Sequence, residues 1–159
     1  MAEISFRFAK KGDGELVLNF IKGLAAYENM SERVVATPSL LEEWLFEKGT
    51  AKVLIGSADG ADVGFALFFD NFSTFLGRAG IYLEDLFVLP EHRGKGYGKA
   101  FLKKLASIAV ESGRGRLDWA CLDWNKSSID FYKAMGAEAL DDWTTYRLEG
   151  ETLLRMAEK

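Results

Sequence analysis

The chain has 159 residues, 48% of them hydrophobic, a length and composition that fit one globular domain and exclude a disordered or low-complexity chain. With Cys121 and His92 as its only cysteine and histidine, the sequence has no disulfide framework, no thiolate zinc site and no multi-histidine centre, so we expect no metal. The net charge of −4 argues against a nucleic-acid partner, and the lack of any apolar run near 18 residues argues against a membrane partner.

The first third of the chain predicts a strand and two helices. Apolar and polar residues alternate over residues 4–8, as in a half-buried strand. Residues 13–28 place their apolar side chains on one helical face. Thr37 followed by Pro38 is typical of a helix start, and we expect that second helix to run to about Phe46.

The middle of the chain predicts strands. Two apolar runs, residues 51–58 and 62–70, are separated by Asp59-Gly60, a dipeptide that favours a tight hairpin turn. Residues 79–89 form another apolar run of strand character.

The last third alternates helices and strands. A glycine-rich stretch at residues 92–99 leads into an amphipathic helix, followed by a strand at 116–122 and a short helix at 127–135. We expect a last strand at 143–149 and a frayed helix after it. The whole order predicts a mixed α/β fold in a single domain, residues 1–159.

The glycine-rich stretch Arg93-Gly94-Lys95-Gly96-Tyr97-Gly98 lies between a predicted strand and a predicted helix. Alternating glycines let the backbone turn tightly and approach a ligand, and unpaired N–H groups at a helix start favour an anion. Cations there are mildly destabilising unless an anion binds. The cations in or near the first turns are Arg93, Lys95, Lys99, Lys103 and Lys104. The pattern therefore predicts a pyrophosphate site.

Two other phosphate motifs fit this stretch less well. A P-loop ends in Gly-Lys-Ser/Thr, whereas Gly98-Lys99 is followed by Ala100. A dinucleotide fingerprint needs glycine where Lys99 stands, although Asp118 lies at a distance suited to the ribose-binding acid. A dinucleotide-dependent oxidoreductase stays open as the weaker alternative.

The same stretch resembles the acyl-CoA-binding motif of the GCN5-related N-acetyltransferase (GNAT) superfamily, Arg/Gln-x-x-Gly-x-Gly/Ala after a strand. Three longer segments resemble its diamine (spermidine/spermine) and thialysine acetyltransferase branch: IYLEDLFVLPEHRGKGYG at 81–98, LDWNKSSIDFYKAMGA at 122–137 and AAYE at 25–28. The resemblance runs from about residue 4 to residue 157, nearly the whole chain.

The resemblance implies the GNAT fold, in which the fourth and fifth strands splay apart, and acetyl-CoA as cosubstrate. It also implies a homodimer. The residues that it assigns to the cofactor are Leu86, Phe87, Val88, Arg93, Gly94, Lys95, Gly96, Tyr97, Gly98, Lys99, Asn125, Lys126, Ser127, Ser128 and Tyr132.

Acetyl transfer to an amine needs a base for the ammonium, a donor for the thioester oxygen and an acid for the leaving thiolate. Glu84 is the candidate base, through a water, because its position beside Leu83 and Leu86 predicts burial and a raised pKa. Alternatively, it only attracts the cationic substrate. Tyr132 is the candidate acid, since the resemblance puts its hydroxyl near the sulfur; by spacing alone it is a core residue.

The acceptor pocket is predicted from acidic and aromatic residues. Tyr27, Glu28, Glu84 and Asp85 form it, with further contacts from Asp118 and Ala120 on the neighbouring strand. The loop at residues 71–75 lacks the acid and tryptophan of polyamine-acetylating members. A small amine or a lysine-like amino acid is therefore preferred over long polyamines.

A lone thiol and a first stretch without an apolar signal core favour the cytoplasm. A non-catalytic CoA-binding module on the same fold is the alternative to an enzyme. Acetylation of protein termini or lysines is a third possibility within the enzyme class.

Overall fold

The computed structural model describes residues 3–159, which form two compact units. The first unit ends at Ala120 and contains the whole β-sheet. The second spans Cys121–Lys159 and contains two helices.

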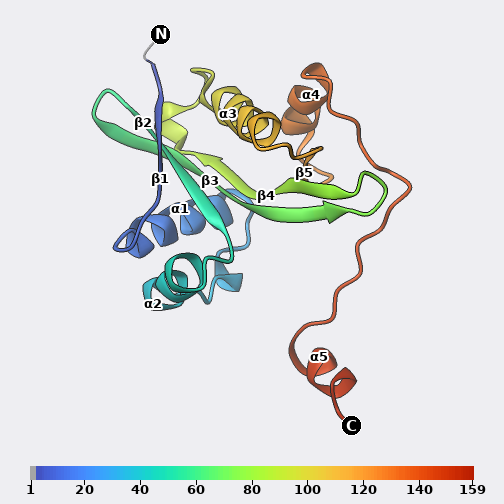
Figure 1. The fold of residues 1–159 in the computed structure, drawn as a ribbon. Helices are drawn as coiled ribbons and strands as arrows, with labels where there is room; N and C mark the ends of the chain where they lie inside the picture. Colours follow the sequence, from blue (N-terminus) through green and yellow to red (C-terminus); the bar gives the residue numbers. More distant parts are fainter. Residues whose placement is uncertain (1–2) are drawn as a thin grey trace. The chain divides into compact units, whose positions relative to one another are not determined.

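A five-stranded sheet organises the first unit (Figure 1). Its spatial order is its chain order, and every neighbouring pair is antiparallel except the parallel pair β4 and β5. The strands are β1 (Ser5–Phe8), β2 (Lys52–Ala58), β3 (Ala61–Ser73), β4 (Arg78–Val88) and β5 (Leu117–Trp119). The predicted mixed α/β fold is confirmed.

The predicted hairpin joins β2 and β3 through Asp59 and Gly60. Both residues have left-handed φ angles, 51° and 77°. Two successive positive φ angles define the turn whose twist matches that of the paired strands, and glycine reaches such angles without steric cost.

Two long helices cover opposite faces of the sheet (Figure 1). On one face, Phe20 of α1 (Gly14–Tyr27) stacks on Phe65 with ring centroids 5.3 Å apart. On the other, Phe101 of α3 (Tyr97–Glu111) meets Phe6 edge to face at 4.9 Å. No helix among residues 3–159 is long and apolar enough to cross a membrane.

The second predicted helix begins where expected but changes type. The Thr37 side chain caps α2 (Pro38–Leu41) by accepting a bond from the Leu40 N–H at 3.1 Å. The helix continues as the wider π-helix η2 (Glu42–Glu47). Two short 3₁₀ turns complete the unit, η1 (Ser31–Arg33) and η3 (Pro90–His92).

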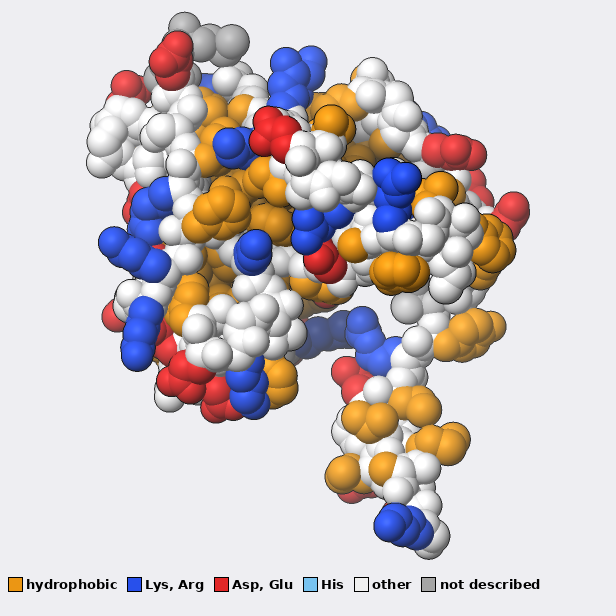
Figure 2. Space-filling model, viewed as in Figure 1, with side chains coloured by type: hydrophobic (Ala, Val, Ile, Leu, Met, Phe, Trp, Pro, Cys, Tyr) orange, Lys and Arg blue, Asp and Glu red, His pale blue; other side chains and the backbone are white. Residues whose placement is uncertain are grey.

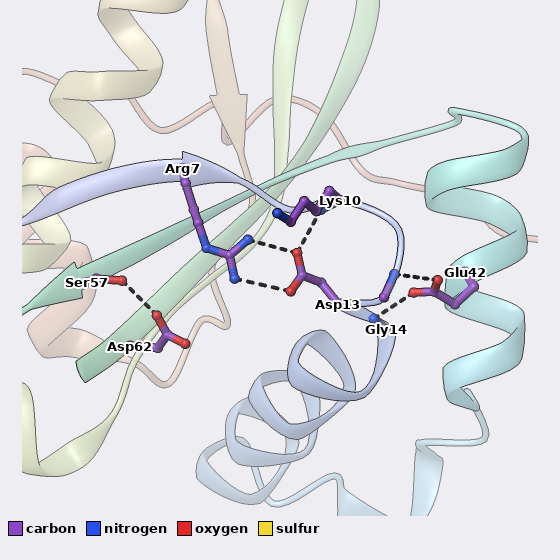
Figure 3. A network of polar contacts seen from close by, with 8 residues as sticks. Arg7, Lys10, Asp13, Gly14, Glu42, Ser57 and Asp62 are labelled. Carbon is purple, nitrogen blue, oxygen red and sulfur yellow. Dashed lines mark hydrogen bonds and ion pairs between the residues drawn. The ribbon is translucent and has the colours of Figure 1, made fainter. Parts of the chain in front are cut away.

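A polar network fixes the start of α1 (Figure 3). The Glu42 carboxylate accepts bonds from the N–H groups of Gly12 and Gly14, both at 2.8 Å. Asp13 pairs with both terminal nitrogens of Arg7, at 2.8 and 3.2 Å. Carboxylates at a helix start satisfy its unpaired N–H groups, so this network ties α1 to β1 and η2.

A β-bulge interrupts β4 at Glu84. Leu67 of β3 pairs with Asp85, but the next residue, Phe68, pairs with Leu83, so Glu84 is the extra residue. In a bulge two residues oppose one, and the strand bends. Leu83 and Asp85 therefore lie on opposite faces of the sheet, although they are two residues apart.

The bulge also explains why β5 is shorter than the predicted strand at 116–122. The last pair of the parallel ladder joins Leu83 to Trp119, directly before the bulge. Because β4 bends at Glu84, the two strands part there. In the described chain no strand pairs with residues 84–88 on that side, the splayed arrangement that the resemblance implies.

The second unit contains α4 (Lys126–Ala134), as predicted, and α5 (Gly150–Met156). The strand predicted at residues 143–149 is wrong: these residues form no strand. Their pattern of apolar residues suits a strand, but a strand needs a hydrogen-bonded partner, and Cys121–Lys159 holds no other strand. Apolar side chains of α5 lie exposed (Figure 2).

Candidate active site

The glycine-rich junction has the backbone that the sequence predicted. Gly94 and Gly96 adopt left-handed φ angles of 78° and 82°, and α3 begins directly after Gly96. No side chain caps that helix start. A Cβ built on Gly94, Gly96 or Gly98 would meet no atom within 4 Å. The loop thus presents bare backbone and uncapped N–H groups to open space.

The surroundings of this loop favour an anion. The first turn of α3 contains no acidic residue. Lys95, Lys99, Lys103 and Lys104 are exposed, and none forms an ion pair within residues 3–159. A phosphate there would gain from the helix dipole and from these charges. The Tyr97 side chain is buried against Ala58 and Val63, so it is not available to a ligand at the loop.

The open side of β4 offers hydrogen-bonding groups for a strand-like partner. The Leu89 N–H donates to the Val63 carbonyl at 2.8 Å, and bonding partners alternate along an antiparallel ladder. The backbone of Phe87 therefore faces β3, while the backbone groups of Leu86 and Val88 face the open side. Among the predicted cofactor residues Leu86, Phe87 and Val88, the ladder thus leaves the backbone groups of Leu86 and the N–H of Val88 available, while the Val88 carbonyl accepts a bond from Arg93.

Arg93 is held by three groups of the first unit. Its Nε donates to the Val88 carbonyl at 2.9 Å. Its guanidinium carbon lies 4.8 Å from the centroid of the Tyr27 ring and 5.2 Å from that of Phe87. The Phe87 ring in turn lies against α1, where a Cβ on Gly23 would approach it within 2.7 Å. Arg93 thus joins the end of β4 to the end of α1.

The two carboxylates of the bulge differ in burial, and the prediction for Glu84 is wrong in this respect. Glu84 is exposed, because the bulge removes it from the regular alternation of the strand. Asp85 is the partly buried carboxylate. Burial, with the charges of Glu84 and Glu28, raises the pKa of Asp85 to about 6. Burial also raises the pKa of Glu28.

A pocket of about 340 Å³ lies between α1, the segment that follows it and β4. Three charged residues line it: Glu28, Arg33 and Asp85. The rest of the lining is apolar and consists of Ile21, Leu24, Ala25, Met30, Val34, Val35 and Ala36. The sequence pointed to Glu28 and Asp85. It gave no signal for Arg33 or the apolar wall beyond their closeness to Glu28 along the chain.

The other predicted acceptor residues do not line this pocket. Tyr27 supports Arg93, and Glu84 lies at the bulge. Asp118 pairs with Arg116 at 2.9 Å and accepts from Asn71 at 3.2 Å, so its charge is partly neutralised. Ala120 is exposed at the end of the first unit.

The second unit carries the remaining predicted residues. Asn125 caps α4, with Oδ1 accepting from the Ser128 N–H and the Ser127 hydroxyl, both at 3.4 Å. Lys126 pairs with Asp130 at 3.5 Å. Tyr132 lies beside Phe131, with ring centroids 5.6 Å apart. These contacts shape α4 itself, and the roles of its residues toward a cofactor stay predictions.

Residues 23–137 match the model of the acetyltransferase (GNAT) family. The chain is also 39% identical to a thialysine N-epsilon-acetyltransferase of Bos taurus, over 100% of both chains. It belongs to the GNAT family. The recognition made from the YLED and glycine motifs is thereby confirmed, and the protein is an N-acetyltransferase. The dinucleotide-dependent oxidoreductase receives no support from these matches.

Solved structures share this fold. An integron cassette protein from the mobile metagenome of V. cholerae is 30% identical, with a TM-score of 0.81 over 98% of both chains. An aminoglycoside N-acetyltransferase, solved in complex with CoA, has a TM-score of 0.72 at 19% identity, covering 94% of this chain and 97% of its own. The second likeness shows the fold alone.

No cluster of three or more His, Cys, Asp or Glu side chains that could hold a metal ion occurs within residues 3–159.

Proposed function

We propose that this acetyltransferase moves an acetyl group from acetyl-CoA to the primary amine of a small molecule. A lysine-like amino acid is the preferred acceptor, and a di- or polyamine is the second class. The observation that carries the proposal is the pocket in which Glu28 and Asp85 lie together, next to the open side of β4. Two partly buried carboxylates favour a cationic ligand. The similarity to a thialysine acetyltransferase supports the amino-acid class.

The residues at the glycine-rich loop fit an acyl-CoA. The open space at Gly94, Gly96 and Gly98 and the uncapped start of α3 suit a pyrophosphate, with Lys95 and Lys99 as cations. The backbone groups of Leu86 and the N–H of Val88 suit the pantetheine arm of the cofactor, which carries amide groups. When bound, acetyl-CoA supplies the acetyl thioester. We assign the donor for its oxygen to the Leu86 N–H, which faces the open side.

We assign removal of the ammonium proton to the carboxylates of the bulge. Asp85, with a pKa of about 6, is deprotonated near pH 7 yet basic enough to accept a proton. Glu84 beside it attracts the cationic acceptor, the milder of the two roles predicted for it. If Glu84 is itself the base, the pH profiles of Glu84→Gln and Asp85→Asn identify it.

We assign delivery of a proton to the leaving sulfur to Tyr132, on the basis of its Phe-Tyr-Lys context. Tyr132→Phe removes this proton and keeps the ring. It should lower kcat roughly 100-fold with little change in KM, because the contact forms only in the transition state. Phe131→Tyr, which adds a hydroxyl on the same helix, serves as a control for altered packing. Turnover of Tyr132→Phe near wild type would contradict the assignment.

The family match runs from residue 23 to residue 137, across the boundary at Ala120, which supports one acetyltransferase domain over 1–159. We also propose a homodimer in the cytoplasm without nucleic-acid, membrane or metal partners. The homodimer rests on the resemblance to the acetyltransferase family, and the exposed Trp143 and Tyr146 of the second unit are compatible with it. Analytical ultracentrifugation of the full chain tests the dimer.

One assay tests the function directly. Purified protein is mixed with acetyl-CoA and a panel of lysine, ornithine, thialysine, cadaverine, putrescine, spermidine and a lysine peptide, and thiol release is measured. We expect the fastest release with the free amino acids. Binding of CoA without turnover on any amine would contradict the proposal and favour the non-catalytic module.

A further inference from the structure

One charge in the acceptor pocket, that of Arg33, takes no part in the proposed acetyl transfer. Arg33 ends η1 and lines the pocket together with Glu28 and Asp85. Its backbone N–H donates to the Met30 carbonyl at 2.9 Å. Its guanidinium forms no ion pair with any acidic side chain of residues 3–159. The positive charge is therefore available to a ligand.

The pocket has two poles of opposite sign. Burial and the charges of Glu84 and Glu28 raise the pKa of Asp85, and Glu28 and Asp85, which both line the pocket, form the negative pole. Arg33 pairs with neither of them and forms the positive pole on the exposed side. Apolar side chains such as Leu24 and Val34 complete the lining. A ligand that matches this pattern carries an ammonium, a short methylene chain and an anionic group.

We infer that Arg33 binds the carboxylate of the acceptor, so that the site selects amines that also carry an anionic group over diamines of the same length. This inference rests on the proposed amine acetylation. A guanidinium matches a carboxylate with two parallel N–H donors. A diamine of the same length brings its second ammonium toward Arg33 with no carboxylate beside it, so the repulsion between the two cations is not compensated. Arg33 is thus a specificity-determining residue, and Asp85 receives the amine to be acetylated.

Acceptor pairs that differ only in the carboxylate test this inference. The pairs are lysine with cadaverine and ornithine with putrescine, assayed by thiol release from acetyl-CoA. For wild type we expect kcat/KM to be roughly tenfold or more higher for each amino acid, the effect of one charge-assisted contact. Arg33→Met should bring the ratio of kcat/KM between each amino acid and its diamine close to one, by lowering kcat/KM for the amino acids alone. Arg33→Lys keeps the charge but loses the two parallel N–H donors, so it should retain part of the preference for the amino acids.

Two controls separate specificity from general damage. Lys11→Met removes one exposed positive charge at the other end of α1 and should leave both ratios unchanged. Lysine amide, tested on wild type, lacks the carboxylate and should behave like cadaverine, a measurement that needs no variant.

Two results would overturn the inference while leaving the proposed function intact. One is a wild type that uses cadaverine and lysine amide as well as lysine. The other is an Arg33→Met variant with unchanged ratios. Failure of the proposed function is distinct, because wild type would then release no thiol with any acceptor.

Discussion

The Arg93 guanidinium lies over the ring of Tyr27, with its central carbon 4.8 Å from the ring centroid. Tyr27 is the last residue of α1, whereas Arg93 is the first residue of the glycine-rich motif. The Nε bond to the Val88 carbonyl joins the end of β4 to the same pair. One side chain thus connects the helix that lines the acceptor pocket with the loop assigned to the cosubstrate.

Arg93→Lys should weaken the binding of both substrates. Lysine keeps the charge but loses the planar group that stacks on Tyr27 and donates to Val88. The lost contacts amount to about 1–2 kcal/mol, so KM for acetyl-CoA and for the amine should rise by at most about 5- to 30-fold, and Tm should fall. Steady-state kinetics and a thermal melt measure these effects. Lys95→Met, the comparison variant, should raise KM for acetyl-CoA alone. If Arg93→Lys also raises only the KM for acetyl-CoA, Arg93 does not connect the two sites.

The pH dependence of kcat/KM should distinguish the two carboxylates of the bulge. Wild type should lose activity below about pH 6 as Asp85 takes up a proton. Asp85→Asn should remove this acidic limb of the pH profile, together with most of the activity. Glu84→Gln should keep the limb but move it to lower pH, because the Glu84 charge raises the pKa of Asp85. If Glu84→Gln removes the limb and Asp85→Asn retains it, Glu84 is the base.

Asp85 should also make the protein less stable at neutral pH. Its pKa is about 6 in the folded chain and about 3.9 in an unfolded one, so the folded state holds the proton more tightly. Stability is therefore lost as the pH rises from about 4 to about 6. Asp85→Asn should be more stable than wild type above pH 6, by up to about 3 kcal/mol, and the gain should vanish below pH 4. Denaturant melts at several pH values measure this, and an equal gain at all pH values would contradict it.

Gly98→Ala should separate folding from cosubstrate binding. Gly98 lies in the first turn of α3 with an ordinary φ angle, and an added Cβ meets no atom within 4 Å. Alanine should therefore stabilise the helix by about 0.5–1 kcal/mol. Its methyl group projects into the open space assigned to the pyrophosphate, so KM for acetyl-CoA should rise roughly tenfold, the effect of about 1.4 kcal/mol. An unchanged KM in a folded variant would contradict the assignment of the loop.

Much of the fold was predictable because its signals are local. The hairpin at Asp59 and Gly60, the helix start at Thr37 and the glycine-rich turn each depend on a few adjacent residues with restricted backbone angles. The strand predicted at residues 143–149 was wrong because pairing depends on a partner strand, which a local pattern does not specify.

At the active site, the motif chemistry was readable from the sequence: glycines and cations at the start of α3, and two adjacent carboxylates in a strand. The tertiary structure alone decided which carboxylate is buried, because the bulge at Glu84 arises from a mismatch in register between β3 and β4. It also decided that Arg33 shares a pocket with Asp85, which is 52 residues away in the printed sequence. Burial and contacts across such separations depend on how the chain packs, and no local pattern of residues encodes them.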